Sequence, residues 1–174
     1  YTGPLRTEIF AKDAIASDDE LREVLARTGV WASAQLGFNN TDVLGMRKDT
    51  AVRLSISTMS DLSVHPALRF GFSNEFLERA DGWPGVRTAY SLPQQDVRGM
   101  AHDLAYRALA SDSIDITDLY STDAEIAYYD LIALQDDRRF FPEYQALFVC
   151  RADVGDDVKR AVSKVSGKID AAAM

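Results

Sequence analysis

Residues 114–123, IDITDLYSTD, decide the fold class of this 174-residue chain. The segment alternates apolar and polar residues as a short β-strand does, and it ends in an aromatic residue, Tyr120. We expect Ser121 and Thr122, with Glu125, to form a capping box that starts a helix directly after the strand. Ligands of open α/β sheets lie at the carboxyl ends of strands, so Tyr120 is either a plug or part of a site.

The rest of the chain alternates predicted helices and strands in the same way, with short connections between them. This alternation predicts an α/β fold with a mainly parallel sheet. Ser17 and Glu20 form a capping box at the start of a helix that Gly29 ends. Valine and isoleucine residues three or four positions apart, from Val154 to Ile169, predict a C-terminal helix with one apolar stripe.

Composition and charge exclude several classes of protein. With 47% apolar and 26% charged residues, the chain can bury one sizeable core or form a large lobe of a bigger protein. Twenty-seven acidic and 19 basic side chains give a net charge of −8. Because the basic residues form no stripe, we expect no nucleic-acid partner. No apolar run approaches the roughly 20 residues that cross a bilayer.

Motifs for phosphate binding, nucleophilic catalysis and metal binding are missing from the sequence. The two histidines, His65 and His102, are expected to have capping or surface roles. Asp118 and Asp123, near the predicted sheet edge, keep open an enzyme with a carboxylate general base, although no activating partner is visible. We therefore expect no cofactor, no metal and no catalytic residue.

Four stretches of aromatic and polar residues stand at predicted strand ends: GFNNTD (37–42), EFLERADGWPG (75–85), DLYSTD (118–123) and DDRRFFPEY (136–144). In this order, and together with the initial YTG and the late VSGKID, they resemble the substrate-binding proteins of ABC transporters for glycine betaine, choline, carnitine and related quaternary ammonium osmoprotectants. The resemblance implies a protein that captures such a solute outside the cytoplasm and delivers it to a membrane permease.

The resemblance also implies a type II periplasmic binding protein fold, in which two lobes close on the ligand. We expect mainly one lobe here, that is, an incomplete bilobal protein: residues 1–37 as a remnant of the first lobe and the crossover, 38–151 as the second, ligand-binding lobe, and 152–174 as a C-terminal helix that returns to the first lobe. Such a fragment is expected to leave apolar surface uncovered along residues 21–31 and the C-terminal helix, and to self-associate through it.

The expected ligand site follows from the resemblance, residue by residue. A quaternary ammonium has no N–H to donate, so aromatic faces attract its diffuse charge. Tyr120 and Tyr144 match two tyrosines of the family's aromatic box, and Arg79 matches the residue that holds a ligand carboxylate. Asn40 and Asp42, from GFNNTD, complete the set. Asp42 stands where family members commonly have a further tyrosine, and its negative charge favours ligands without a carboxylate, such as choline.

Each expectation has an ordinary alternative. We expect Tyr120 and Tyr144 to face one concave surface, with both rings about 6 Å from a common cation; a tyrosine that ends a strand is otherwise a half-buried wedge. Arg79 would otherwise be a surface residue paired with Glu75, four positions earlier. A ligand-sensing effector domain of a regulator is the alternative function, because a fold does not fix a function.

Overall fold

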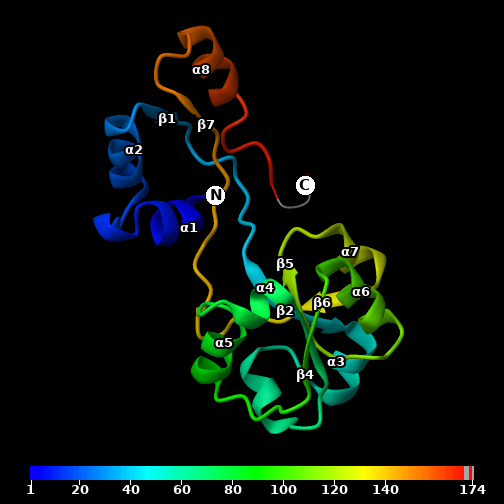
Figure 1. Cartoon of the computed structure of the whole chain (residues 1–174). Helices are drawn as coiled ribbons and strands as arrows, with labels where there is room; N and C mark the ends of the chain where they lie inside the picture. The colour runs from blue at the N-terminus through cyan, green and yellow to red at the C-terminus, as the bar shows by residue number, and fades with distance from the viewer. Residues whose placement is uncertain (171–172, 174) are drawn as a thin grey trace. The chain divides into compact units, whose positions relative to one another are not determined.

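The computed structural model describes residues 1–170 and 173 and divides the chain into two compact units, each described by itself (Figure 1). Unit 1 consists of Tyr1–Thr41 and Pro142–Met174, and unit 2 of Asp42–Phe141. Two segments of unit 1 precede and follow unit 2 along the chain, and they pair with each other within unit 1. The Asn40 N–H donates to the Tyr144 carbonyl at 3.1 Å. The expected second lobe, 38–151, therefore extends past unit 2 at both ends.

The centre of unit 2 is a three-stranded sheet and a two-stranded sheet that a single bridge joins, and we call the two together the unit 2 sheet. Its strands are β2 (Asp42–Arg47), β3 (Phe70–Ser73), β4 (Val97–Met100), β5 (Thr117–Tyr120) and β6 (Leu131–Ala133). β2 pairs antiparallel with β5 and β6, whereas β3 pairs parallel with β4. A parallel bridge between Phe70 and Ile116 joins β3 to the chain that leads into β5. β3, β4, β5 and β6 run in the same direction, so the predicted mainly parallel arrangement is confirmed for these four strands. It is wrong for β2, which runs the other way. β2 follows a segment of unit 1, and not the helical crossover that a parallel neighbour needs.

Short helices connect these strands: α3 (Lys48–Leu54), the 3₁₀ helix η3 (Ser60–Val64), α4 (Asn74–Glu78), α5 (Trp83–Tyr90), α6 (His102–Ala110) and α7 (Ala124–Tyr128). Ser73 caps α4 by accepting a hydrogen bond from the Phe76 N–H. α7 begins after Asp123 as its N-cap, without a side-chain capping bond. The predicted capping box of Thr122 and Glu125 is therefore wrong.

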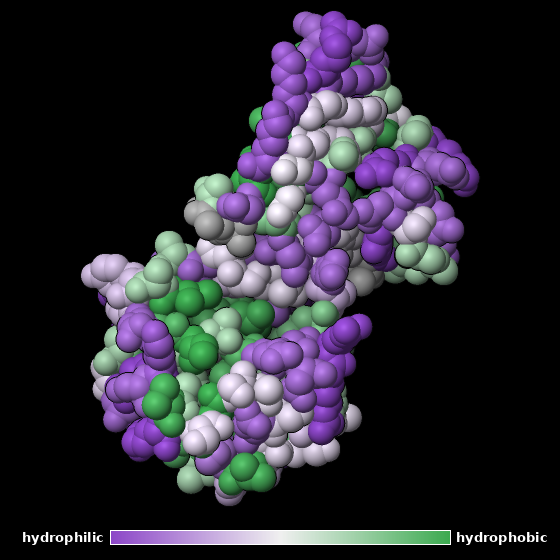
Figure 2. Space-filling model, turned by 180° about the vertical axis from the view of Figure 1, so that it is seen from behind, coloured by the Kyte–Doolittle hydropathy of each residue, from purple (hydrophilic) through white to green (hydrophobic). Residues whose placement is uncertain are grey.

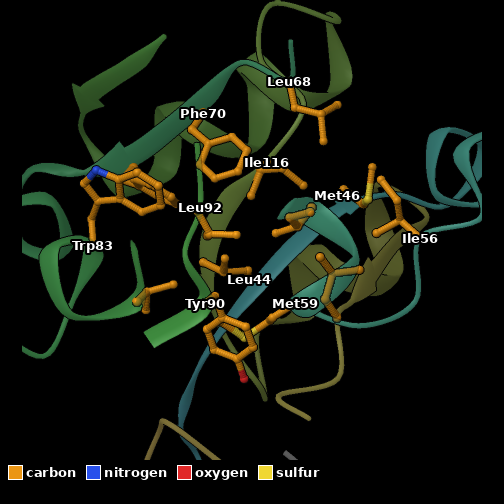
Figure 3. Close-up of a cluster of buried hydrophobic side chains, with 14 of the residues drawn as sticks. Leu44, Met46, Ile56, Met59, Leu68, Phe70, Trp83, Tyr90, Leu92 and Ile116 are labelled. Carbon is orange, nitrogen blue, oxygen red and sulfur yellow. The ribbon is translucent and has the colours of Figure 1, made fainter. Parts of the chain in front are cut away.

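Apolar side chains fill both faces of the sheet in unit 2. Leu44 and Met46 of β2 lie in a cluster with Phe70 of β3, and Figure 3 shows these side chains together with buried ones from α5 and the connecting segments. Val43, which directly precedes Leu44 in β2, packs against a second cluster that includes Leu119. Because successive residues of a strand point to opposite faces, each cluster covers one face. Apolar packing thus covers the sheet from both sides.

Unit 1 contains α1 (Thr2–Pro4), the π-helix η1 (Leu5–Ile9), the 3₁₀ helix η2 (Ala11–Asp13), α2 (Asp18–Arg27), β1 (Val30–Ala32), β7 (Val149–Arg151) and α8 (Asp156–Ser163). β1 and β7 pair antiparallel. The predicted capping box of Ser17 and Glu20 is confirmed, and Gly29 follows α2 with a φ of +77°. Glycine adopts this left-handed conformation without steric cost.

The apolar surface of unit 1 is better covered than the sequence predicts. Leu21 and Leu25 of α2 are buried against a cluster that includes Leu147, so the expectation of an uncovered surface along residues 21–31 is wrong for these two side chains. α8 ends at Ser163, well before Ile169. Self-association through the remaining exposed apolar side chains stays a prediction.

Surface polarity differs between parts of the molecule. In the view from behind, Figure 2 shows mostly hydrophilic residues on the visible face of unit 1, whereas hydrophobic residues also gather on the visible face of unit 2. The exposed large apolar side chains of unit 2 are Val52, Val64, Leu104, Tyr120 and Tyr128. Within residues 1–170 and 173, no helix combines the length and the apolar character needed to cross a membrane.

Candidate functional site

One edge of the unit 2 sheet collects polar and aromatic side chains. β3 and β5 end there at Ser73 and Tyr120, and β2, which runs the other way, begins there at Asp42. Asp42 lies directly opposite Tyr120 in the β2–β5 ladder, so both side chains leave the same face of the sheet. We call this the carboxyl edge; it comprises Asp42, Ser73, Glu75, Arg79, Asp81, His102, Asp118, Tyr120 and Asp123. Ligands of α/β sheets lie at such an edge.

Arg79 is held by several carboxylates at this edge. Its Nη2 donates to Asp42 Oδ2 at 3.0 Å, and its Nε donates to Asp81 Oδ1 at 2.8 Å. Glu75 lies further away, with 3.5 Å between Arg79 Nη1 and Glu75 Oε1. The predicted ordinary partner, Glu75, is therefore present, but Asp42 and Asp81 are closer. The guanidinium is already engaged inside unit 2.

Asp42 is a buried acid whose charge is balanced by this contact. Burial raises the pKa of the Asp42 carboxyl, and the neighbouring Arg79 opposes that rise. In the other direction, the hydrogen bond to Asp81 and then the charge of Asp42 raise the pKa of Arg79. From the sequence we expected Asp42 to add a negative charge to the site. The structure shows one member of an ion pair.

Tyr120 presents part of its ring to solvent at the carboxyl edge, with 37% of its surface exposed. Its ring packs against the His102 ring, with 5.1 Å between centroids and 40° between planes. Burial, followed by the charge of Asp42, raises the pKa of the Tyr120 hydroxyl above its usual value. The side chain is therefore a neutral phenol with an accessible aromatic surface.

His102, Asp118 and Asp123 form a network beside Tyr120 that sequence reasoning assigned to other roles. His102 Nδ1 lies 3.6 Å from Asp118 Oδ2, and His102 Nε2 lies 3.4 Å from Asp123 Oδ2. Asp123 also accepts hydrogen bonds from the Tyr106 hydroxyl and from the Tyr120 N–H, the latter at 2.8 Å. The predicted capping role of His102 is wrong, because α6 has Ala101 as its N-cap and no side-chain capping bond; the imidazole is partly exposed but paired with two acids. Because Asp118 and Tyr120 are two positions apart on a predicted strand, the sequence could have placed them on the same face of that strand. No sequence pattern links either residue to His102.

Asp118 is the buried centre of this network. It is 4% exposed and accepts hydrogen bonds from the Ser73 N–H and the Ser73 hydroxyl, both at 2.6 Å. Burial by itself would raise the pKa of Asp118, but the neighbouring His102, followed by the hydrogen bonds from Ser73, holds it below the usual value. The pKa of Asp123 is likewise lowered, against its burial, by His102 and Tyr106. Carboxylates with lowered pKa values are weak general bases, which argues against the enzyme alternative.

The remaining expected site residues, Asn40 and Tyr144, lie in unit 1. Tyr144 is 9% exposed, and its ring lies so close to Gly3 that a Cβ there would come within 1.7 Å of Cδ1. The Tyr144 N–H donates to Asn39 Oδ1 at 2.6 Å. The structure thus brings Asp42, Arg79 and Tyr120 together in one unit and Asn40 and Tyr144 in the other. A surface shared by Tyr120 and Tyr144 stays a prediction.

Side chains suited to a metal ion are not grouped at the carboxyl edge. Among residues 1–170 and 173, no three His, Cys, Asp or Glu side chains are arranged to hold one. The acidic groups of the edge are instead paired with Arg79, His102 and hydrogen-bond donors. What the edge offers is an aromatic ring among carboxylates.

Known proteins combine this sequence pattern and this fold. Residues 1–174 match the family described as the substrate binding domain of the ABC-type glycine betaine transport system. The chain is 38% identical to the ergothioneine transport permease/ergothioneine binding protein EgtU of Helicobacter pylori (strain G27), over 78% of this chain and 24% of that protein. It is 35% identical to the carnitine transport binding protein OpuCC of Listeria monocytogenes serotype 1/2a (strain 10403S), over 76% of this chain and 45% of that protein.

A solved structure agrees with these matches. The crystal structure of a glycine betaine/carnitine/choline ABC transporter superimposes on this chain with a TM-score of 0.86 at 30% identity. The match covers 99% of this chain and 67% of the chain in that crystal structure. The chain spans less than half the length of the two named relatives. The predicted type II periplasmic binding protein fold is confirmed. The chain belongs to the family of substrate-binding domains of ABC-type glycine betaine transport systems.

Proposed function

We propose that this chain is part of the solute-binding component of an ABC importer, and that it captures a quaternary ammonium osmoprotectant and delivers it to a membrane permease. The relatives named above are binding proteins for carnitine and ergothioneine. Import requires capture on the outer side of the membrane, so we propose an extracytoplasmic location. The ligand contacts proposed for this chain are Asn40, Asp42, Arg79, Tyr120 and Tyr144.

One observation supports this proposal above the others: the exposed ring of Tyr120 lies among carboxylates. Five acidic side chains of the carboxyl edge face two cationic ones, Arg79 and His102, which leaves a formal charge of −3. An aromatic face attracts a diffuse cation, and the surrounding negative charge adds to that attraction. A quaternary ammonium suits this surface better than an anion does.

The alternative functions receive less support. The matched family consists of solute-binding proteins of transporters and not of enzymes, and neither the family nor the named relatives support a regulator. The lowered pKa values of Asp118 and Asp123 give no general base. A solute-binding component is therefore the function that the carboxyl edge supports best.

Replacing Tyr120 by alanine is expected to weaken choline binding about 30-fold, because a desolvated cation over an aromatic ring gains about 2 kcal/mol. Tyr120→Phe keeps the ring and should bind within about threefold of the native protein, since a quaternary ammonium does not need the hydroxyl. Calorimetric titration of the intact protein measures both. The matched control is Tyr128→Ala, because Tyr128 is 80% exposed and lies in α7. Equal affinities of Tyr120→Ala and native protein would contradict the proposal.

Replacing Asp42 by asparagine tests the kind of quaternary ammonium. The change keeps the size of the side chain, removes one negative charge and releases Arg79 from its contact at 3.0 Å. We expect glycine betaine to gain about fivefold relative to choline, because its carboxylate is no longer repelled and can reach the guanidinium. Asp42→Tyr should change the ratio in the same direction. The control is Asp96→Asn, which removes the acid of another Asp–Arg pair. Asp96 lies just before β4, and its partner Arg98 lies within β4. An unchanged ratio of the two affinities would contradict a role of Asp42 in selectivity.

A further inference from the structure

His102 is placed between two acids that come from different elements. Asp118 belongs to β5 and faces Nδ1, while Asp123 precedes α7 and faces Nε2. Tyr106, one turn further along α6, packs edge-on against the imidazole with 5.3 Å between ring centroids. Tyr120 packs on it at 5.1 Å. These four side chains are the titratable groups in contact with His102 from α6, β5 and the turn before α7.

This placement requires a particular charge state. A neutral imidazole has one N–H and one lone pair, whereas the imidazolium has an N–H on each nitrogen. With a carboxylate at both nitrogens, a neutral His102 would direct its lone pair at a negative charge. The carboxylate of Asp118, followed by that of Asp123, raises the pKa of His102 to about 10. The imidazolium is therefore the form that matches the geometry at neutral pH.

The two acids also flank Tyr120 along the chain. Asp118 precedes it by two residues on β5, and Asp123 accepts a hydrogen bond from the Tyr120 N–H at 2.8 Å. His102 connects both acids and contacts the Tyr120 ring itself. Removing the imidazolium would leave two neighbouring carboxylates without the cation between them, and like charges at short distance repel. The turn that contains Tyr120 would then lose its fixed position.

We propose that His102 is a positioning residue which, as an imidazolium between Asp118 and Asp123, fixes the Tyr120 ring for capture of the cationic ligand. The proposal rests on the proposed function in so far as Tyr120 binds the ligand. Its structural part, a charged imidazole that holds the Tyr120 turn, concerns the ligand-free protein. The two parts can therefore be tested separately.

The first test uses ¹⁵N and aromatic ¹³C NMR of the ligand-free intact protein at pH 8. The chain has two histidines, so His65→Gln assigns the signals of His102. We expect both ring nitrogens of His102 to be protonated at this pH, and the Tyr120 ring signals to shift as His102 loses its proton between about pH 9 and 11. A neutral imidazole at pH 8 would overturn the proposal, and this measurement needs no variant of His102.

The second test measures choline affinity against pH for native protein, His102→Gln and the control His65→Gln. We expect His102→Gln to bind choline about tenfold more weakly at pH 7, because a misplaced ring loses most of its cation contact. The loss of affinity on acidification should also begin about one pH unit higher, since Asp118 and Asp123 no longer have the cation that lowers their pKa values. His102→Lys restores a positive charge at this position. In this variant, the pH at which choline affinity begins to fall on acidification should return toward that of the native protein.

The outcomes separate the two proposals. Unchanged choline affinity and an unchanged pH profile in His102→Gln would overturn the positioning role even if the native protein binds choline. Absence of binding of choline, glycine betaine and carnitine by the native protein would refute the proposed function, and the NMR result would still decide the charge state and contacts of His102.

Discussion

Replacing Asp118 by alanine is expected to lower the free energy of unfolding by about 3–5 kcal/mol, the range found when one partner of a buried charge pair is removed. The carboxylate is 4% exposed and accepts two hydrogen bonds from Ser73, at the end of β3. It also faces His102 at 3.6 Å. Its loss leaves the Ser73 donors unpaired and the imidazolium with one carboxylate fewer, and unpaired buried groups cost more than the mean hydrogen bond. Urea denaturation followed by circular dichroism measures the change.

Two controls identify the cause of that loss. Asp103→Ala removes an exposed acid from the first turn of α6 and should cost less than about 1 kcal/mol. Asp118→Asn keeps an acceptor for Ser73 but not the charge, so its cost should lie between the two alanine variants. A loss below about 1 kcal/mol for Asp118→Ala would show that the network does not stabilise unit 2.

Replacing Gly82 by alanine is expected to lower the free energy of unfolding by about 3 kcal/mol, at the upper end of the usual cost of overpacking. An added Cβ would lie 2.0 Å from the carbonyl oxygen of Phe76 and 3.2 Å from that of Arg79. These are backbone atoms, so no side-chain rotation relieves the clash, and the turn between α4 and α5 must open. Because Arg79 lies in this turn, its contact with Asp42 should also weaken, and the preference between choline and glycine betaine should change. Denaturation and calorimetric titration report the two effects.

Gly155 provides a matched control for Gly82. Both glycines are the N-cap residues of helices, α8 and α5 respectively. At Gly155, however, the nearest atom to an added Cβ is the side-chain oxygen Oδ1 of Asp157, which can rotate away. Gly155→Ala should therefore cost less than about 1 kcal/mol. Equal costs for the two variants would show that helix capping, and not the close approach of the Phe76 carbonyl, limits residue 82 to glycine.

Local signals in the sequence predicted the local structure well. The Ser17 and Glu20 capping box, the left-handed Gly29 and the short strand that ends at Tyr120 are all confirmed. Each depends on residues within a few positions of one another, so neighbouring side chains and backbone groups specify it. The capping box at Thr122 failed although its pattern was as good. There the chain places Asp123 at the N-cap, and its carboxylate contacts Tyr106 and His102 from α6.

The candidate site could be predicted only in part for the same reason. The spaced motifs named Asp42, Arg79 and Tyr120 as ligand contacts, and in the structure these residues lie near one another at the carboxyl edge. They did not show that Asp42 forms an ion pair with Arg79, because this contact joins residues that are 37 positions apart in the sequence. His102 was missed because a single histidine at a helix start has no local pattern that distinguishes a surface residue from a network member.

By itself, the sequence determined the class of fold, the strand that ends at Tyr120 and the family, because alternation and spaced motifs are properties of the chain itself. Only the tertiary structure decided that β2 runs against its neighbours, which places Asp42 opposite Tyr120. It also decided that Arg79 is paired and that His102 lies between two acids. Charge pairing depends on distances between side chains from different elements, and those distances are set when the sheet and its covering helices pack together.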